Sequence, residues 1–579
     1  MPKPALKVDG QWHTGAQKKA DTFVDAFAKK NVMDPLEENN YSRLNFQMEE
    51  SEFERPTEEN VSEVLQALDE SSATGPDLVP TRILKQCYAA LSLPILMLIC
   101  SILDWGKWPQ LWKNHWICPL YKKKAQSDPN NYRGVHLTGQ ISKVAERVLA
   151  HRFVPDLVQR GAFGINQFAY MAERGARDAL AFLTLSWIDG WRRRFKFAVY
   201  CSDVSGAFDK VNAEILFCKL TAYGVCKRLL RVLQSWLGEP VVVEGQCSKE
   251  MPLSNMVYQG TVFGPPLWNV HFGDAAQGVR AEGFTEVVFA DDLNAWKAYP
   301  NSIDDDELHT DLKACQHSLH EWGLGNQVVF DPAKESFHVL ASTGRGSGNN
   351  FKLLGVNFDT GLTMGDEIQG LVKAASWKIA AVQRIRRYFN AHQVINVYKS
   401  QILNFLECRT AAIYHACNSH LERLDALQKR FLHEMGISEE AGLAEYRLAP
   451  LAVRRDIAML GLIHRTVIGK GPDQFKTFFR LSDVDINRRQ TRQRASRHSK
   501  QLIDPRDDHH TELTKRSALG LIAIYNLLPQ RVIDTTDVSE FQSQLQELVK
   551  GQMRSGDVHW RGLLSPRIPL LMHPLTKLK

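Results

Sequence analysis

The spacing of apolar residues along the chain predicts a mixture of strands and helices. Short runs rich in Val, Phe, Trp and Tyr predict strands, which we expect at 116–121, 132–137, 197–202, 285–290 and 293–298. Apolar residues that recur every three or four positions predict helices, which we expect at 16–30, from Thr57, at 81–103, from Ile141, and at 374–388, 394–406, 421–435, 519–528 and 538–549. This mixture indicates an α+β protein.

Acidic residues end some of these strands. The third predicted strand is almost continuously apolar, as in a strand covered on both faces, and Asp203 follows it. The last two strands predict a hairpin with Asp291 and Asp292 at its tip. Because a buried carboxylate is costly unless it is paired or binds metal, such acids on neighbouring strands can hold two divalent ions on a phosphoryl group. The alternative is a solvated acidic surface, which we assign to 304–306 and 507–508.

A basic segment separates the first two predicted strands. Lys122–Lys124 end the first strand, and Arg133 lies in the second. Lysine point charges and an arginine fork suit phosphate binding, although a solvated charged turn explains the pattern equally well. Thr138 is placed to cap the helix that follows.

Two further segments can be interpreted either as ligand-binding segments or as ordinary structural elements that bind no ligand. Arg174 and Arg177, beside Gly175, can contact a template backbone, or they can lie exposed at the start of a helix. Gly260 and the Gly-Pro-Pro at 264–266 let a backbone approach a nucleotide, or they form an unliganded turn.

Composition narrows the class of protein. The 579 residues carry a net charge of +6, which permits a polyanionic partner without requiring one. The ten cysteines form no CxxC pair, which argues against a disulfide framework or zinc ribbon and favours a reducing compartment. The apolar run 91–103 is interrupted by Pro94 and Ser101, so we expect a buried helix rather than a membrane span. With no signal peptide evident, we expect an intracellular protein of the cytoplasm or nucleus.

Taken in order, the motifs resemble the reverse transcriptases of non-LTR (LINE-like) retrotransposons, from about Thr57 to Leu462. The segments that match the family are GPDLVP at 75–80, the stretch 119–146 with NYR at 131–133, QFAY through Arg-Gly at 167–175, DVSGAFDKV at 203–211, QGTVFGP at 259–265, FADD at 289–292, the W/GL/N/K segment at 322–334, and LLGV at 353–356.

The resemblance implies an RNA-directed DNA polymerase that extends a primer 3′-OH with dNTPs on an RNA template, using two Mg²⁺ ions or Mn²⁺ in their place. It assigns the metal site to Asp203, Val204, Asp291 and Asp292, with Lys334 as the catalytic residue that protonates the pyrophosphate. It assigns the dNTP site to Lys122, Arg133, Val204, Phe208, Gln259 and Gly260, with Phe208 as the plate that rejects a 2′-OH. It assigns contacts with primer and template to Gly355, Arg174 and Arg384.

The implied fold is a right-hand polymerase with fingers, an antiparallel palm sheet with helices, a helical thumb and a helical C-terminal extension. The expected division is an N-terminal extension at 1–56, fingers at 57–194, palm at 195–350, primer grip and thumb at 351–470, and a basic linker with the C-terminal extension at 471–579. The linker contains the acid-free basic run 486–500. We see no endonuclease signature, so we expect target nicking to come from elsewhere, and we expect no membrane partner.

The sequence departs from the family pattern near the expected pocket. Met256–Tyr258 replaces the usual Gly-Val-Pro, Phe263 stands where Leu is common, and Gly134 stands where Pro often follows the arginine. An alternative hypothesis is therefore a catalytically inactive or domesticated nucleic-acid-binding relic. An RNA-templated RNA polymerase is a third hypothesis, against which Phe208 argues because NTP selection favours a smaller or polar residue.

Overall fold

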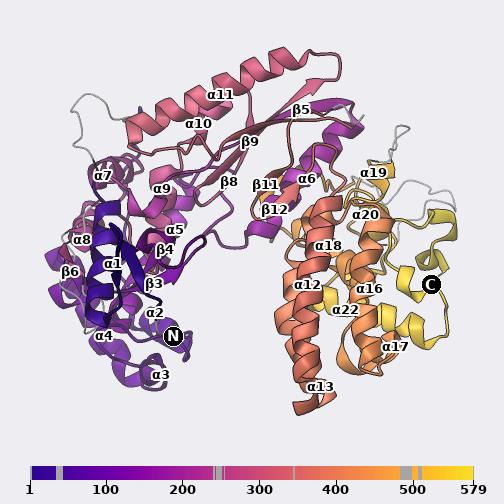
Figure 1. Cartoon of the computed structure of the whole chain (residues 1–579), viewed down its shortest axis with the longest axis horizontal. Helices are drawn as coiled ribbons and strands as arrows, with labels where there is room; N and C mark the ends of the chain where they lie inside the picture. The colour runs from indigo at the N-terminus through magenta and orange to yellow at the C-terminus, as the bar shows by residue number, and fades with distance from the viewer. Residues whose placement is uncertain are drawn as a thin grey trace.

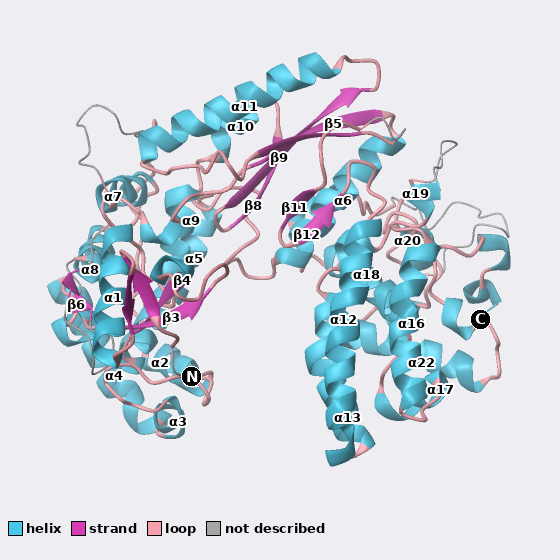
Figure 2. Ribbon diagram, in the orientation of Figure 1, coloured by secondary structure: helices cyan, strands magenta, loops and turns pink. Residues whose placement is uncertain are grey.

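The computed structural model describes residues 3–33, 44–238, 241–242, 251–252, 255–342, 346–482, 498–505 and 512–577. Figure 1 shows an arch, in which one lobe holds the N-terminus, the other holds the C-terminus, and a sheet covered by the long helix α11 (Asp305–Asn326) joins them. Two hydrophobic clusters fill the lobes. The predicted mixture of helices and strands is confirmed (Figure 2).

The joining sheet is antiparallel, with the strand order β10-β5-β9-β8. Its strands are β5 (Phe195–Cys201), β8 (Thr285–Phe289), β9 (Asp292–Pro300) and β10 (Ser336–Leu340). Alternate residues of β5 belong to different clusters: Val199 packs in the C-terminal lobe and Tyr200 in the N-terminal lobe. The apolar run of β5 therefore serves two cores at once, which explains why it lacks a polar face.

The N-terminal lobe contains the predicted basic hairpin, with β3 (Trp116–Tyr121) and β4 (Tyr132–Leu137) at the expected positions. Helix α1 (Ala16–Lys30) lies against this hairpin, and α2 (Glu58–Gln66) starts at a capping box formed by Thr57 and Asn60. The other elements of this lobe are β1 (Leu6–Val8), β2 (Gln11–His13), α5 (Gln140–Gln159), α7 (Ala213–Ala222), α8 (Lys227–Leu237), β6 (Val241–Val242), β7 (Met251–Pro252), α9 (Gly264–Phe272) and α10 (Ala276–Ala281).

The prediction that Thr138 caps the following helix is wrong. Helix α5 begins after Gly139, and its first backbone N–H, that of Gln140, donates to the Asp77 carboxylate at 2.7 Å. Thr138 is buried instead. Gly75 packs so closely against it that a Cβ added to Gly75 would stand only 2.1 Å from the Thr138 carbonyl oxygen. A residue distant in sequence thus supplies the cap, because the Gly75 turn is packed against the helix start.

The single helix expected at 81–103 is two helices, α3 (Thr81–Gln86) and α4 (Tyr88–Trp105), separated at Cys87. The expectation that the apolar run is buried is also wrong, because only 28% of α4 is buried and one face exposes Leu93, Met97 and Leu98. By length and composition α4 could cross a membrane, and it is the one such helix among the described residues.

After β5, Ala207–Asp209 form a single 3₁₀ turn, and the next helix, α7, starts after its cap residue Asn212. The acidic run at 304–306 starts helix α11, with Asp304 as its cap, and Asp304 and Asp306 are exposed as expected of a solvated acidic surface. The run at 507–508 and most of the basic segment 486–500 lie outside the described residues.

Among the described residues, the C-terminal lobe is mainly helical, with one small hairpin, β11 (Phe351–Leu353) and β12 (Val356–Phe358). The helix expected at 394–406 is interrupted by a π-helical turn at Lys399–Leu403. The helices of the lobe are α6 (Ala176–Arg192), α12 (Gly365–Ile385), α13 (Ala391–Tyr398), α14 (Asn404–Glu407), α15 (Thr410–Ile413), α16 (Asn418–Glu434), α17 (Glu439–Tyr446), α18 (Leu451–Val467), α19 (Glu512–Lys515), α20 (Leu521–Tyr525), α21 (Gln530–Ile533) and α22 (Val538–Arg554).

A buried ion pair links helix α7 to the segment that directly follows helix α9. The Lys219 ammonium lies 2.5 Å from an Asp274 carboxylate oxygen and also donates to the His271 carbonyl at 2.6 Å, and both charged side chains are almost fully buried. Burial lowers the pKa of Lys219, which the Asp274 charge partly offsets.

We predict that Asp274→Ala destabilises the protein by about 3 to 5 kcal/mol, because it strands a buried ammonium. The double change Lys219→Met with Asp274→Ala recovers most of the loss. The exposed pair Lys476–Asp473 is the control, and Asp473→Ala costs less than about 1 kcal/mol. Thermal unfolding of the wild type and the three variants measures this, and an equal fall in Tm for Asp274→Ala and Asp473→Ala would contradict it.

Candidate active site

The Asp291-Asp292 hairpin tip is a strained turn held from two sides. Phe289 pairs with Asp292, so Ala290 and Asp291 alone form the loop, and Ala290 has φ +60°. The Ala290 N–H donates to the Gln167 side-chain oxygen at 3.0 Å, and its carbonyl accepts from the Trp268 indole at 3.0 Å. These bonds hold a conformation that L residues seldom adopt.

Asp203 lies across the sheet from this tip. β5 and β9 pair Cys201 with Asn294, and the Ser202 N–H and hydroxyl both donate to the Leu293 carbonyl, at 3.1 and 2.7 Å. When this antiparallel register is continued by two residues beyond the pair of Cys201 and Asn294, Asp203 lies opposite Asp292. The structure thus brings together the three carboxylates that the sequence singled out.

The acids repel one another. Burial raises the pKa of Asp292 to about 7, and the charges of Asp291 and Asp203 add to this increase. Burial also raises the pKa of Asp291, again with a contribution from Asp203, while Arg133 and Lys122 oppose it. Carboxylates crowded in this way favour binding of cations.

Lys334 is the nearest cation to Asp203. Its ammonium lies 2.5 Å from an Asp203 carboxylate oxygen and 2.8 Å from Asp331, and these hydrogen bonds raise the pKa of Lys334. Backbone bonds on either side of Val204, from Asp331 N to Asp203 O and from Ser205 N to Val329 O, fix this arrangement. In such a pairing the carbonyl of the central residue, Val204, points away from the partner strand.

The donors present fit a divalent metal. Three carboxylates and the Val204 carbonyl form a set of hard oxygen ligands, the kind that Mg²⁺ and Mn²⁺ prefer. The described residues contain no ready-made cluster of three metal-binding side chains. The Lys334 ammonium pairs with one of the three carboxylates, that of Asp203.

Basic side chains of the β3–β4 hairpin face the acids. Lys122 and Arg133 both oppose the rise in the pKa of Asp291, and burial together with the charge of Arg133 lowers the pKa of Lys122 itself. The charge of Lys334, which lies outside the hairpin, also lowers the pKa of Lys122. The predicted phosphate-binding residues therefore lie near the predicted metal ligands.

The 259–264 loop lies between strand β4 and the turn that carries Asp209. The Gln259 amide donates to Asp209 at 3.1 Å, and the Gln259 carbonyl accepts from His136 N of β4 at 2.7 Å. Gly260 has φ +98°, and a Cβ there would stand 2.8 Å from the His136 carbonyl oxygen. Phe208 is 8% exposed and stacks on Trp268 with ring centroids 5.5 Å apart.

The residues predicted to contact primer and template lie on separate elements. Gly355 (φ +81°) is in the turn between β11 and β12, and Arg384 is exposed on α12. Arg174 is half-buried and donates to the carbonyls of Ile165 and Gln167, at 3.0 and 3.1 Å. Arg174 therefore braces the segment that holds the hairpin tip.

Sequence reasoning missed three supporting residues, Gln167, Trp268 and Glu146. Gln167 and Glu146 lay within matched motifs, yet periodicity carried no sign of their distant partners. The buried Glu146 accepts hydrogen bonds from Val262 N and Phe263 N, at 2.8 and 3.1 Å, and so fixes the loop after Gly260.

The departures from the family pattern are accommodated by packing. Met256–Tyr258 is buried, and Tyr258 packs edge-on against Trp236, with ring centroids 4.9 Å apart. A Cβ on Gly134 would stand 3.0 Å from an Ile117 methyl and 3.6 Å from the Phe27 ring of α1.

We predict that Glu146→Gln raises the Tm at pH 8 and has little effect near pH 5. Burial raises the pKa of Glu146 from 4.5 to about 7, so the folded state binds the proton more tightly than the unfolded state. The stability from this group is complete below about pH 4.5 and is lost as the pH rises through 7, by about 3 kcal/mol. Thermal unfolding at both pH values tests this, with the exposed Glu63→Gln as control. A pH-independent difference would refute the prediction.

Comparisons with known proteins agree with this geometry. Residues 121–358 match the family described as reverse transcriptase (RNA-dependent DNA polymerase). The chain is 24% identical over 465 residues to the RNA-directed DNA polymerase from mobile element jockey of Drosophila melanogaster, covering 75% of this chain and 50% of the relative. It is 23% identical over 399 residues to the probable RNA-directed DNA polymerase from transposon X-element of the same species, covering 64% and 43%.

A third relative is the Pol polyprotein from type-1 retrotransposable element R1 of Bradysia coprophila, 23% identical over 282 residues and covering 46% of this chain and 26% of the relative. The chain spans at most about half the length of these relatives. Residues 121–358 therefore match a reverse transcriptase domain, which implies a fold with palm and fingers, and the resemblance of the chain to the polymerases of non-LTR mobile elements is confirmed.

Proposed function

We propose that this protein is an RNA-directed DNA polymerase that extends a primer 3′-OH with dNTPs on an RNA template. The observation that carries the proposal is the convergence of Asp203, Asp291 and Asp292 opposite the cationic side chains of Lys122 and Arg133. Acids on one side and cations on the other suit a triphosphate bound through divalent metal.

The proposed roles of the side chains follow from this arrangement. Two Mg²⁺ ions, or Mn²⁺, held by the three carboxylates and the Val204 carbonyl would activate the 3′-OH and neutralise charge on the triphosphate. Lys122 and Arg133 bind the phosphates. Lys334, whose pKa is raised, remains protonated and is placed to donate a proton to the leaving pyrophosphate.

The pocket wall selects the nucleotide. Phe208 is fixed by stacking on Trp268, so it presents a rigid edge beneath the sugar, where a 2′-OH would collide. Gln259 and Gly260 lie beside it, and Gly260 has no side chain to fill the space. The packing of Met256–Tyr258 favours this active pocket over the relic hypothesis.

Beyond the pocket, we assign the helical lobe to a thumb and a C-terminal extension. Arg384 lies on α12, with Arg386 and Arg387 directly after it, and suits contact with a primer–template backbone, while the Gly355 turn suits contact with the primer end. The nine cysteines described are all free, which fits action inside the cell.

The test is primer extension with an RNA template, an annealed DNA primer, dNTPs and Mg²⁺. We expect extension by the wild type, and a loss of about a hundredfold or more in Asp291→Asn. Faster incorporation of NTPs than of dNTPs would favour an RNA polymerase. A folded wild type that binds the hybrid without extending it would overturn the proposal in favour of the relic.

We predict that Gln167→Leu lowers the extension rate by about tenfold to a hundredfold, because the Ala290 N–H loses its partner and the tip shifts. Affinity for the primer–template stays unchanged, as gel-shift titration would show. The exposed Gln159→Leu is the matched control. Equal rates for the two variants would show that the turn does not depend on Gln167.

A further inference from the structure

Helix α1 forms part of the wall behind the fingers hairpin. Phe23 packs edge-on against Tyr132 of β4, with ring centroids 4.9 Å apart. Phe27 lies against Gly134, where an added Cβ would stand 3.6 Å from its ring. The sequence placed this helix outside the polymerase core, whereas its apolar face is buried against the strand that carries Arg133.

The last residue of α1 reaches the start of that strand. The Lys30 ammonium donates to the Tyr132 carbonyl at 3.0 Å and to the Asn130 carbonyl at 3.4 Å. Both carbonyls lie within three residues of Arg133, so Lys30 fastens the backbone from which Arg133 projects. The neighbouring Lys29 is exposed and shares none of these contacts.

Lys30 also acts electrostatically on a partly buried acid. Asp209 follows the plate residue Phe208 and accepts a hydrogen bond from Gln259 at 3.1 Å. Burial raises the pKa of Asp209, and the charges of Lys30, Lys122 and Arg133 oppose this increase. The charges of three cations therefore act on one carboxylate, which lies next to the plate residue Phe208.

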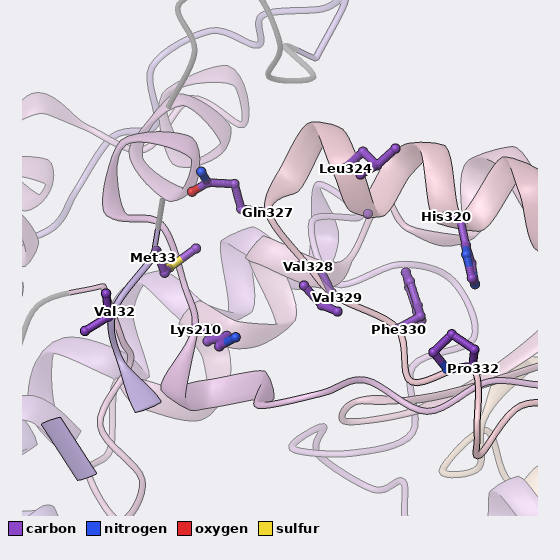
Figure 3. A pocket seen from close by; sticks show the side chains of 11 residues that line it. Val32, Met33, Lys210, His320, Leu324, Gln327, Val328, Val329, Phe330 and Pro332 are labelled. Carbon is purple, nitrogen blue, oxygen red and sulfur yellow. The ribbon is translucent and has the colours of Figure 1, made fainter. Parts of the chain in front are cut away.

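An open cavity of about 430 Å³ adjoins this cluster. Figure 3 shows Val32 and Met33, which follow α1, on one side of the cavity and Phe330 and Pro332 on the other, with Lys210 between them. Lys210 follows Asp209 directly, and Pro332 follows Asp331, the partner of Lys334. The end of α1 thus lies between the fingers hairpin and the loop that carries Lys334.

We propose that α1 is part of the dNTP site and that Lys30 is a positioning residue for the triphosphate. Lys30 holds β4 so that Arg133 faces the phosphates, and it neutralises Asp209, whose charge would otherwise repel them. The inference rests on the proposed function, since it names a further residue of the same nucleotide site.

The expected effect is on nucleotide affinity. Without Lys30, the Asp209 carboxylate faces the triphosphate with one cation fewer, so the KM for dNTP rises while the chemical step is left intact. A purely structural role would lower the Tm and change kcat and KM together. Replacing Asp209 by its neutral isostere removes the charge that Lys30 balances, so the two changes compensate each other.

The experiment measures single-nucleotide extension with dTTP for Lys30→Ala, Lys30→Arg, Lys29→Ala and the double variant Lys30→Ala with Asp209→Asn. We expect the KM to rise about tenfold in Lys30→Ala, with kcat within about twofold of the wild type. Lys30→Arg and the double variant recover most of the affinity, and Lys29→Ala behaves as the wild type.

A second measurement separates this inference from the proposed function. A fluorescent dTTP analogue is titrated into each full-length variant with Ca²⁺ and primer–template, so binding is read without turnover. About tenfold weaker binding by Lys30→Ala alone supports the inference, even if the wild type extends no primer. If the wild type extends primers, equal binding by Lys30→Ala and Lys29→Ala would overturn the role of Lys30 and leave the proposed function standing. If the wild type does not bind the dTTP analogue, both proposals are overturned.

Discussion

Mutual repulsion among three carboxylates is the constraint on which the rest of the structure depends. Asp203, Asp291 and Asp292 stand at one end of a sheet, and burial and proximity raise the pKa of Asp292 to about 7. Left unsupported, such a tip would relax outward. The hydrogen bonds of Gln167 and Trp268 with Ala290, and the pairing of Val204 with Phe330, prevent this. The protein is therefore built to keep these acids together before any cation binds.

Burial on both faces of the sheet makes this possible. β5 contributes alternate side chains to two separate cores, so the strand that leads to Asp203 is clamped from above and below. A site on a strand held in this way is positioned more firmly than one on a loop. Arg174 adds to this support. It donates a hydrogen bond to the carbonyl of Gln167, the residue whose side chain holds the hairpin tip.

The sequence predicted what depends on local patterns. The bounds of β3 and β4 followed from β-prone runs and a polar turn, and the three acids followed from their places at strand ends. Partners distant in sequence were beyond it. Asp77 caps α5 in place of Thr138, and Glu146 holds the 259–264 loop, because tertiary packing brings these carboxylates to unpaired N–H groups. The break at Cys87 and the exposed face of α4 were missed because apolar periodicity does not reveal what covers a helix.

The hydrogen bond from His136 N to the Gln259 carbonyl has a consequence for motion. Gly260 lies so close to β4 that the base of the fingers hairpin and the palm loop form one continuous body. The hairpin cannot swing as a rigid flap about its base without breaking this joint. The far end is held as well, because Lys30 donates to the carbonyls of Asn130 and Tyr132. Any adjustment of this hairpin is therefore left to its exposed side chains, Lys122–Lys124, on a backbone that is fixed at both ends.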